Sequence, residues 1–375
     1  MPASPRLPED LTPQARLYVR PHPVVPDPAV EHGLDGMGCR SLAGGSHAFA
    51  GCEVLVRDGD RIMSYDVSFR ELDAWKDALV PPQRLTVDSQ LQRMSSARPP
   101  LAGLHWDRPI LMGVINMTPD SFYSGSQAPS VSAARDAALA MVEAGADIVD
   151  VGGESTRPGG AEPVSVEEEL SRVIPLVEAL ARLPVPVSLD TRHAEVMLQG
   201  VGAGAAVIND INALNGEGCL EVAAKTGVPV ILMHCPADFA AMHKPTSYDH
   251  VALEVFDWLE QRLEACEAAG IRRESLIVDP GIGFVKQAPQ SAAALARVSL
   301  LHSLGCPVLV GASRKSFIGR LAGGDTADDR LPGSLAAALW AAGQGVQILR
   351  VHDVAETRQA IALQSAIESG LTEVY

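Results

Sequence analysis

Polar and charged side chains recur at the ends of short apolar runs in the second part of this 375-residue chain. Each run consists of β-branched and aliphatic residues and closes on residues that donate or accept hydrogen bonds: Asn116, Asp150, Asp190, Asn209, His234, Asp279, Lys315, Arg350 and His352. Carboxylates, amides and cations in one place can bind an anion, or a flat heterocycle rich in donors and acceptors. A single Asp or Asn there is equally well explained as a turn or a helix cap, but so many in register predict a shared site.

The repeat of apolar runs and longer segments along the chain also predicts the strands and helices that position these residues. Apolar runs without alternation suit strands buried on both faces, and the helix-length segments between them suit the crossovers of a parallel sheet. Eight such units in about 265 residues predict an α/β fold of the (β/α)8 barrel type, with its chemistry at the C-terminal ends of the strands. An open doubly wound sheet is the alternative, because periodicity does not count strands around a ring. The runs cover residues 110–116, 147–153, 186–191, 206–210, 228–234, 275–281, 307–315 and 347–353.

Cations after three of the runs predict an anion side of the site. Arg157 lies in DVGGESTRPGG, where Pro158 fixes a turn and glycine pairs bracket the arginine. SRKS at 313–316 places Arg314 and Lys315 on one turn with two hydroxyls, and alternation along the last strand directs Arg350 and His352 to the same side. A phosphate-binding corner is common at this place in such barrels.

Acids and amides after other runs predict a heterocycle side. Asp190, Asn209 and Asp279 end the third, fourth and sixth runs. Together with Lys315 they could hold a flat ring by complementary hydrogen bonds. The mouth of the barrel is therefore predicted to have an anion side and a heterocycle side.

Composition limits the class of protein. The net charge of −16 and the lack of a Lys/Arg-rich run argue against a nucleic-acid partner. The six cysteines show no CxxC spacing, which indicates a reducing compartment and predicts neither a disulfide framework nor a zinc site. The N-terminus lacks the apolar core of a signal peptide and no apolar stretch is long enough to span a bilayer, so we expect a cytoplasmic protein without a membrane partner.

Residues 1–105 form a different kind of sequence, an N-terminal extension of unknown role before a barrel at 106–375. Its start is rich in proline, which predicts extended or irregular backbone. Residues 48–66 predict a hairpin that turns at Asp58-Gly59, followed by a helix over 68–79 and a linker over 93–100. No catalytic constellation is visible here, and the expected role is an accessory layer on the barrel or a surface for self-association.

The motifs NMTPDSF, DVGGESTRPG, SLDT, IND, DPGIGF, SRKS and RVHDV follow one another over residues 110–354. In these pieces the chain resembles the dihydropteroate synthases, a family of folate-pathway transferases inhibited by sulfonamides. The resemblance implies condensation of 6-hydroxymethyl-7,8-dihydropterin diphosphate with p-aminobenzoate, which yields 7,8-dihydropteroate and pyrophosphate. It also implies small-molecule substrates as the partners, Mg2+ as the cofactor and a homodimer.

Site residues also follow from the resemblance. It implies that the pterin ring is bound by Asp190, Asn209, Asp279 and Lys315, with Asp150 in the same substrate-binding set. It places the diphosphate at Asn116, Arg350 and His352, with Mg2+ beside Asn116. It places p-aminobenzoate at Thr156, Arg157, Pro158, Phe284 and Ser316. The residues expected to act in catalysis are Arg157, Asp279, Lys315, Arg350 and His352.

Three positions depart from the family pattern. Ser124 stands where the first loop usually has an aspartate, Cys235-Pro236 follow the fifth strand, and Val285 replaces a glycine in DPGIGFVK. These departures keep open a non-catalytic pterin-binding homologue, with the N-terminal segment as an interaction module. A methyltetrahydrofolate-binding methyltransferase domain is a further alternative, although it has no use for STRPG, SRKS and RVHD together.

Overall fold

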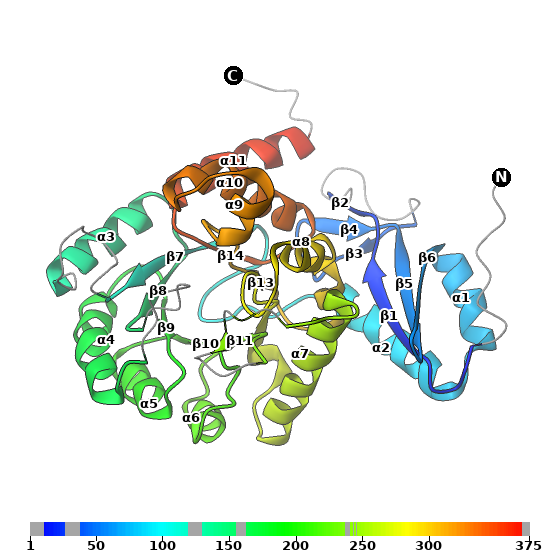
Figure 1. Cartoon of the computed structure of the whole chain (residues 1–375), viewed down its shortest axis with the longest axis horizontal. Helices are drawn as coiled ribbons and strands as arrows, with labels where there is room; N and C mark the ends of the chain where they lie inside the picture. The colour runs from blue at the N-terminus through cyan, green and yellow to red at the C-terminus, as the bar shows by residue number, and fades with distance from the viewer. Residues whose placement is uncertain are drawn as a thin grey trace.

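The N-terminal segment and the barrel are distinct parts of the fold, and in Figure 1 the blue N-terminal sheet stands beside the green-to-red barrel. The computed structural model describes residues 11–26, 38–118, 130–154, 163–236, 241–242, 244 and 246–369. Within these residues no helix is both long and apolar enough to cross a bilayer.

The N-terminal part contains two small antiparallel sheets. One has the order β1-β5-β6, from β1 (Arg16–Pro21), β5 (Gly51–Asp58) and β6 (Arg61–Ser68). The other has the order β2-β4-β3, from β2 (Val24–Pro26), β4 (His47–Phe49) and β3 (Arg40–Ser41). The predicted hairpin is confirmed, since Asp58 pairs with Arg61 around a turn in which Gly59 has φ +59°. The predicted helix is α1 (Phe69–Ala78), which begins at a capping box between Ser68 and Glu71.

The linker predicted over 93–100 is wrong in its first residues, because helix α2 (Pro81–Ser95) extends into it. Tertiary contacts explain the helix. Gln90 accepts a hydrogen bond from Val19 N at 2.6 Å and donates one to Leu17 O at 3.1 Å, so its amide pairs with the backbone of strand β1. Val87, Leu91 and Met94 pack into the core of the N-terminal part. These partners lie about 70 residues away in sequence, and local patterning does not reveal them.

The barrel prediction is confirmed. Eight parallel strands run in the order β12-β11-β10-β9-β8-β7-β14-β13, and a bridge between Val278 and Val308 joins the two end strands into a ring. Their bounds are β7 (Ile110–Asn116), β8 (Ile148–Gly152), β9 (Val187–Asp190), β10 (Val207–Asp210), β11 (Val230–Met233), β12 (Leu276–Asp279), β13 (Leu309–Val310) and β14 (Ile348–Val351).

Helices surround this ring (Figure 1). They are α3 (Val131–Glu143), α4 (Val166–Leu180), α5 (Ala194–Ala203), α6 (Cys219–Thr226), α7 (Val251–Ala268), α8 (Ala288–Ala296), α9 (Ser316–Ala322), α10 (Leu331–Gly343) and α11 (Val354–Glu368), with short 3-10 turns η3 (Arg273–Ser275), η4 (Val298–Leu304) and η5 (Asp328–Arg330).

Alternation along the strands sorts the barrel interior into layers. The apolar layer near the base contains Ile110, Met112, Ile148, Val207, Ile231, Ile277, Leu309 and Ile348, and Leu101, Leu104 and Trp106 close it from below. Residues two positions further along a strand point to the same side. The next layer therefore receives Asp150, Asp190, Asn209, Asp279 and Arg350, which are the polar residues predicted at the strand ends.

Charged side chains join the N-terminal part to the outer helices of the barrel. Arg20 donates to Glu53 Oε2 at 2.7 Å within the N-terminal sheet and to Ser299 Oγ at 2.8 Å on η4. Arg297, at the end of α8, lies 3.4 Å from the same carboxylate. Both Arg20 and Glu53 are buried. This interface fits the expected accessory layer on the barrel.

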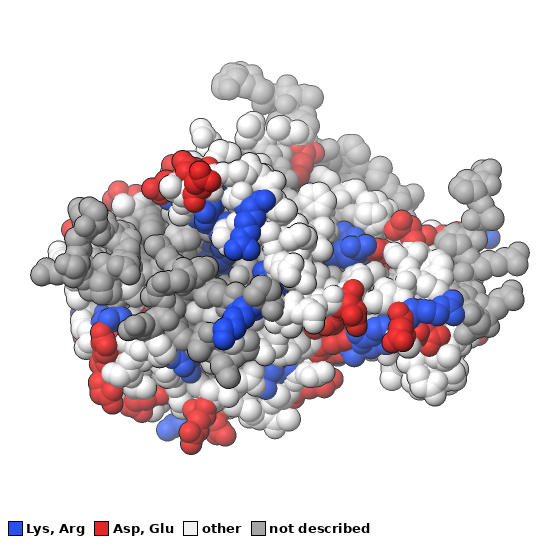
Figure 2. Space-filling model, viewed as in Figure 1, with Lys and Arg blue, Asp and Glu red and all other residues white. Residues whose placement is uncertain are grey.

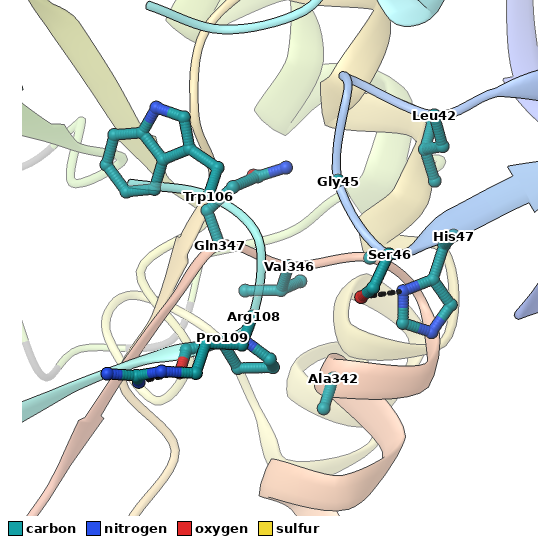
Figure 3. Close-up of a pocket in the computed structure, with 11 residues that line it drawn as sticks. Leu42, Gly45, Ser46, His47, Trp106, Arg108, Pro109, Ala342, Val346 and Gln347 are labelled. Carbon is teal, nitrogen blue, oxygen red and sulfur yellow. Dashed lines mark hydrogen bonds between the residues drawn. The ribbon is translucent and has the colours of Figure 1, made fainter. Parts of the chain in front are cut away.

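A small cavity of about 10 Å³ lies at the seam between the two parts, close to the starts of β7 and β14. Figure 3 shows Ser46 and His47 facing Val346 and Ala342 across it, with Trp106 on another wall. This volume is about the room of one water molecule. The strands begin here, so the cavity is at the opposite end of the barrel from the polar layer.

Candidate active site

Arg350 is the centre of the polar layer at the barrel mouth. Its Nε donates to Asp150 Oδ2 at 2.7 Å, and its Nη2 lies 2.8 Å from Asp190 Oδ2. Asn209 donates to the same Asp150 oxygen at 3.1 Å. Four predicted site residues from four strands are thereby brought together. The expected division of the mouth needs correction, since the arginine assigned to the anion side contacts the carboxylates of the heterocycle side.

The Asp150 carboxylate is fully buried, and its Oδ1 has no hydrogen-bond partner among the described residues. A buried unpaired acceptor is rare in a folded protein and indicates a donor that comes from a ligand or from water. Burial raises the pKa of the neighbouring Asp190 to about 8, although the charge of Arg350 opposes this rise. The mouth thus combines carboxyl oxygens that can accept hydrogen bonds with the Arg350 guanidinium, which two of these carboxyl groups hold in place.

Asp279 and Lys315 form the opposite wall. Asp279 Oδ1 accepts a hydrogen bond from Gly281 N at 2.8 Å, and Lys315 Nζ donates to Ile282 O at 2.6 Å. The ammonium of Lys315 also lies 4.5 Å from the centre of the Phe284 ring. Burial raises the pKa of Asp279 against the opposing charge of Lys315, and burial lowers the pKa of Lys315 to about 8. Asp279 ends β12 and Lys315 comes after β13, and both contact the loop that follows β12.

Small residues leave room between these groups. A Cβ atom on Gly311 would lie 3.7 Å from Arg350 Cβ and 3.8 Å from Lys315 Nζ. A Cβ atom on Gly152 would lie 3.3 Å from the Asn116 side-chain oxygen and 3.5 Å from Asp190 Cβ. Asn116, the predicted metal ligand, therefore lies beside the carboxylate layer, with its amide oxygen at the mouth.

The remaining predicted site residues divide into two groups. His352 directly follows the last strand and its Nδ1 lies 3.1 Å from Ser313 Oγ, while Ser316 begins α9 directly after Lys315. Thr156, Arg157 and Pro158 lie outside the described residues, as does Ser124. Their proposed roles stay predictions from the sequence.

Two residues expected at the mouth, His234 among the strand ends and Arg314 at the phosphate-binding corner, have their partners elsewhere. His234 is buried behind the strand, where its ring packs at 5.1 Å against Trp258 and its Nδ1 lies 2.9 Å from Lys286 Nζ. It falls outside the inward register of Ile231 and Met233, which alternation determines. Arg314 instead donates to Asp353 Oδ2 at 2.9 Å and to Asp328, so it stabilises the turn before α9.

The described residues contain no group of three His, Cys, Asp or Glu side chains that could hold a metal ion. Mg2+ usually keeps several waters and takes one or two protein oxygens together with substrate phosphates. The amide oxygen of Asn116 fits such a site, in which most ligands would come from the diphosphate and from water.

The family pattern "Pterin binding enzyme" matches residues 112–352. A dihydropteroate synthase of Escherichia coli is 48% identical over 264 residues, which cover 70% of this chain and 93% of that protein. One from Synechocystis is 41% identical over 262 residues, or 69% of this chain and 90% of that protein. The chain therefore belongs to the pterin-binding enzymes.

Solved structures agree with the sequence relatives. A Xanthomonas albilineans dihydropteroate synthase with 4-aminobenzoic acid is 46% identical, with a TM-score of 0.68 over 72% of this chain and 98% of that one. The same enzyme was solved with 7,8-dihydropteroate, at 44% identity and a TM-score of 0.65 over 71% and 96% of the two chains. A Yersinia pestis enzyme in a sulfonamide complex is 45% identical, with a TM-score of 0.68 over 72% and 99%.

Proposed function

We propose that this chain is a transferase that condenses 6-hydroxymethyl-7,8-dihydropterin diphosphate with p-aminobenzoate to give 7,8-dihydropteroate and pyrophosphate. The observation that carries the proposal is the polar layer of Asp150, Asp190, Asn209, Asp279 and Arg350 at the mouth of a pterin-binding barrel. The relatives that cover the barrel at 41 to 48% identity are dihydropteroate synthases.

The pterin is the ligand whose chemistry fits the acceptors of this layer. Its amino group and ring N–H groups are donors, while Asp150, Asp190 and Asp279 supply carboxylate oxygens. Lys315 and Asn209 supply donors for the ring oxygen and nitrogen atoms. The unpaired Oδ1 of Asp150 would then gain a partner when the ring binds.

The diphosphate fits the side of the mouth formed by Asn116, Arg350 and His352. Mg2+ bound near Asn116 would neutralise charge on the leaving group. Arg350 remains cationic, because its neighbouring carboxylates raise its pKa further against the opposing effect of burial. The guanidinium can therefore stay positively charged while its N–H groups donate to phosphate oxygens in place of the carboxyl oxygens that they contact now.

The reaction needs no protein nucleophile. The bond between the pterin CH2 and the diphosphate oxygen breaks, the aryl amine nitrogen forms the new bond to that carbon, and one amine proton is released. Positive charge that develops on the pterin is stabilised by the carboxylate of Asp279, and by that of Asp190 when it is ionised. Phe284 and Ser316, with Thr156, Arg157 and Pro158 from the sequence, are assigned to the p-aminobenzoate site. We place the reaction in the cytoplasm.

A homodimer is the assembly that the outer surface supports. Helix α10 has no charged residue, and Trp340 is 48% exposed on its outer side. Its indole N–H donates to Leu295 O of α8 at 3.1 Å, so the two helices form one apolar face. Figure 2 shows the surface over α8 without Lys, Arg, Asp or Glu. Trp340→Glu should give monomers in light scattering, whereas Leu85→Glu, at an exposed leucine of α2, should leave the dimer intact.

The activity test uses the purified chain with Mg2+, the pterin diphosphate and p-aminobenzoate. We expect formation of dihydropteroate and an equal amount of pyrophosphate, with competition between sulfonamides and p-aminobenzoate. Asp279→Asn is the matched negative control. Tight pterin binding without turnover across several divalent metals would contradict the enzyme and favour a pterin-binding homologue.

A further inference from the structure

Lys286 is a buried cation next to the site that the reaction described above leaves without a role. Lys286 comes directly after the loop 280–285 in the chain. Its Nζ lies 2.9 Å from His234 Nδ1, 3.0 Å from Gly281 O and 3.2 Å from Phe284 O. Lys286 is 7% exposed and makes no ion pair with the carboxylates of the described residues. An ammonium has three N–H donors, and these three acceptors use all of them.

The two carbonyls that accept hydrogen bonds from Lys286 lie at the two ends of the turn 281–284. Between them the turn provides three contacts to the proposed pterin site. Gly281 N donates to Asp279, Ile282 O accepts from Lys315 at 2.6 Å, and the Phe284 ring lies beside the Lys315 ammonium. A cation that holds both ends of the turn therefore sets the positions of Asp279 and Lys315.

His234 anchors this cation to the barrel. Its ring is packed against Trp258 at 5.1 Å, which fixes the position of Nδ1. Burial, and then the charge of Lys286, lower the pKa of His234, so the ring is neutral. Its Nδ1 can therefore accept a hydrogen bond from the Lys286 ammonium. Lys286 thus connects strand β11, through His234, with the loop after strand β12.

We propose that Lys286 is a positioning residue for pterin binding, which holds the 281–284 turn so that Asp279 and Lys315 face the ring. The proposal rests on the function proposed above. Lys286 also acts on Asp279 through its charge, since burial raises the pKa of Asp279 while Lys315, Arg350 and Lys286 oppose the rise. Burial lowers the pKa of Lys286 to about 7, so its positive charge is present below that pH.

The test compares Lys286→Met, Lys286→Arg and the control Lys225→Met, at an exposed lysine of α6. Calorimetry with 6-hydroxymethylpterin measures the affinity of each for a pterin without diphosphate. We expect Lys286→Met to weaken it by about 10- to 100-fold, the usual effect of a lost charged hydrogen bond. Lys286→Arg should recover part of this loss, and Lys225→Met should bind as the wild type does.

Two further readouts separate positioning from a general effect on folding. The pH below which affinity falls should be higher in Lys286→Met, because Asp279 keeps its proton more easily without the neighbouring cation. In a double-mutant cycle, Lys286→Met should cost little affinity once Asp279→Asn is present. Fully additive losses, or an unchanged pH profile in a folded Lys286→Met variant, would overturn the role of Lys286. If wild-type protein binds no pterin, the function itself is overturned, together with this role.

Discussion

Arg350, on the last strand, lies 2.8 Å from the Asp190 carboxylate on the third strand of the barrel. The same guanidinium contacts Asp150 at 2.7 Å. Asp150 is fully buried, and Arg350 and Asp190 are only 20% and 13% exposed, so the cation contacts two carboxyl groups in a region with little water. A diphosphate must therefore compete with these carboxylates for the guanidinium. The arginine supports the pterin side of the site as well as the anion side.

Arg350→Ala should for this reason lower both stability and affinity for a pterin without diphosphate. Removal of one member of a buried ion pair costs about 3 to 5 kcal/mol, because the remaining charge is left without compensation. Urea unfolding would measure the loss, with Arg272→Ala as an exposed control. Asp150→Asn should recover part of the stability in the Arg350→Ala background. Equal stability of wild type and Arg350→Ala would show that the carboxylates need no cation.

Asp190→Asn should flatten the dependence of stability on pH. Burial raises the pKa of Asp190 to about 8 in the folded state, above about 3.9 in an unfolded chain. Between these two pH values the folded state holds a proton on Asp190 that the unfolded chain has lost. The stabilisation that this proton gives the folded state is therefore complete below about pH 4 and is lost as pH rises toward 8. The slope is at most about 1.4 kcal/mol per pH unit. Unfolding free energies from pH 5 to 7.5 should therefore fall less in Asp190→Asn than in wild type or in the exposed Asp66→Asn control. Parallel profiles would contradict the raised pKa.

Val285 adopts a backbone conformation that favours glycine. Its φ of +45° lies in the left-handed region, which costs an L-residue about 1 to 2 kcal/mol. The side chain is nonetheless buried with Met242 and Phe284, and its backbone N–H donates to Met242 O at 2.8 Å. Val285→Ala should lose packing without relief of strain, whereas Val285→Gly loses packing but gains that relief. We expect the glycine variant to be at least as stable as the alanine variant in thermal unfolding. A clearly less stable glycine variant would refute the strain.

Glu53→Gln should loosen the N-terminal part from the barrel. Burial raises the pKa of Glu53, but hydrogen bonds from Arg20 and Ser64 outweigh this and hold it below its usual value. The carboxylate is therefore stabilising above about pH 4.3, and this contribution is lost as pH falls. At neutral pH the substitution should cost about 3 kcal/mol, since Arg20 stays buried without its partner. Glu274→Gln, at an exposed glutamate, should change stability by less than about 0.5 kcal/mol. Similar effects at both positions would argue against the interface.

The sequence by itself determined the eight strands, the identity of most of the polar residues at their ends, and the family. Runs such as 110–116 and 275–281 predict strands because unbroken apolar residues suit burial on both faces. Because such strands are apolar on both faces, their sequence does not indicate which residues point into the barrel and which point toward the helices. Only the closed ring decided that Asp150 and Asp279 point inward while His234 points outward, since the inner face is set by pairing between neighbouring strands.

Tertiary structure also decided what the long cationic side chains contact. Arg314 and Lys315 are adjacent in sequence, yet Arg314 pairs with Asp353 while Lys315 lies over Phe284. Arg350 is directed by carboxylates from two other strands, and Lys286 by a histidine and two carbonyls. These partners are far apart along the chain, and folding brings them together. The electrostatic cost of a buried charge then selects the one arrangement in which each cation has acceptors.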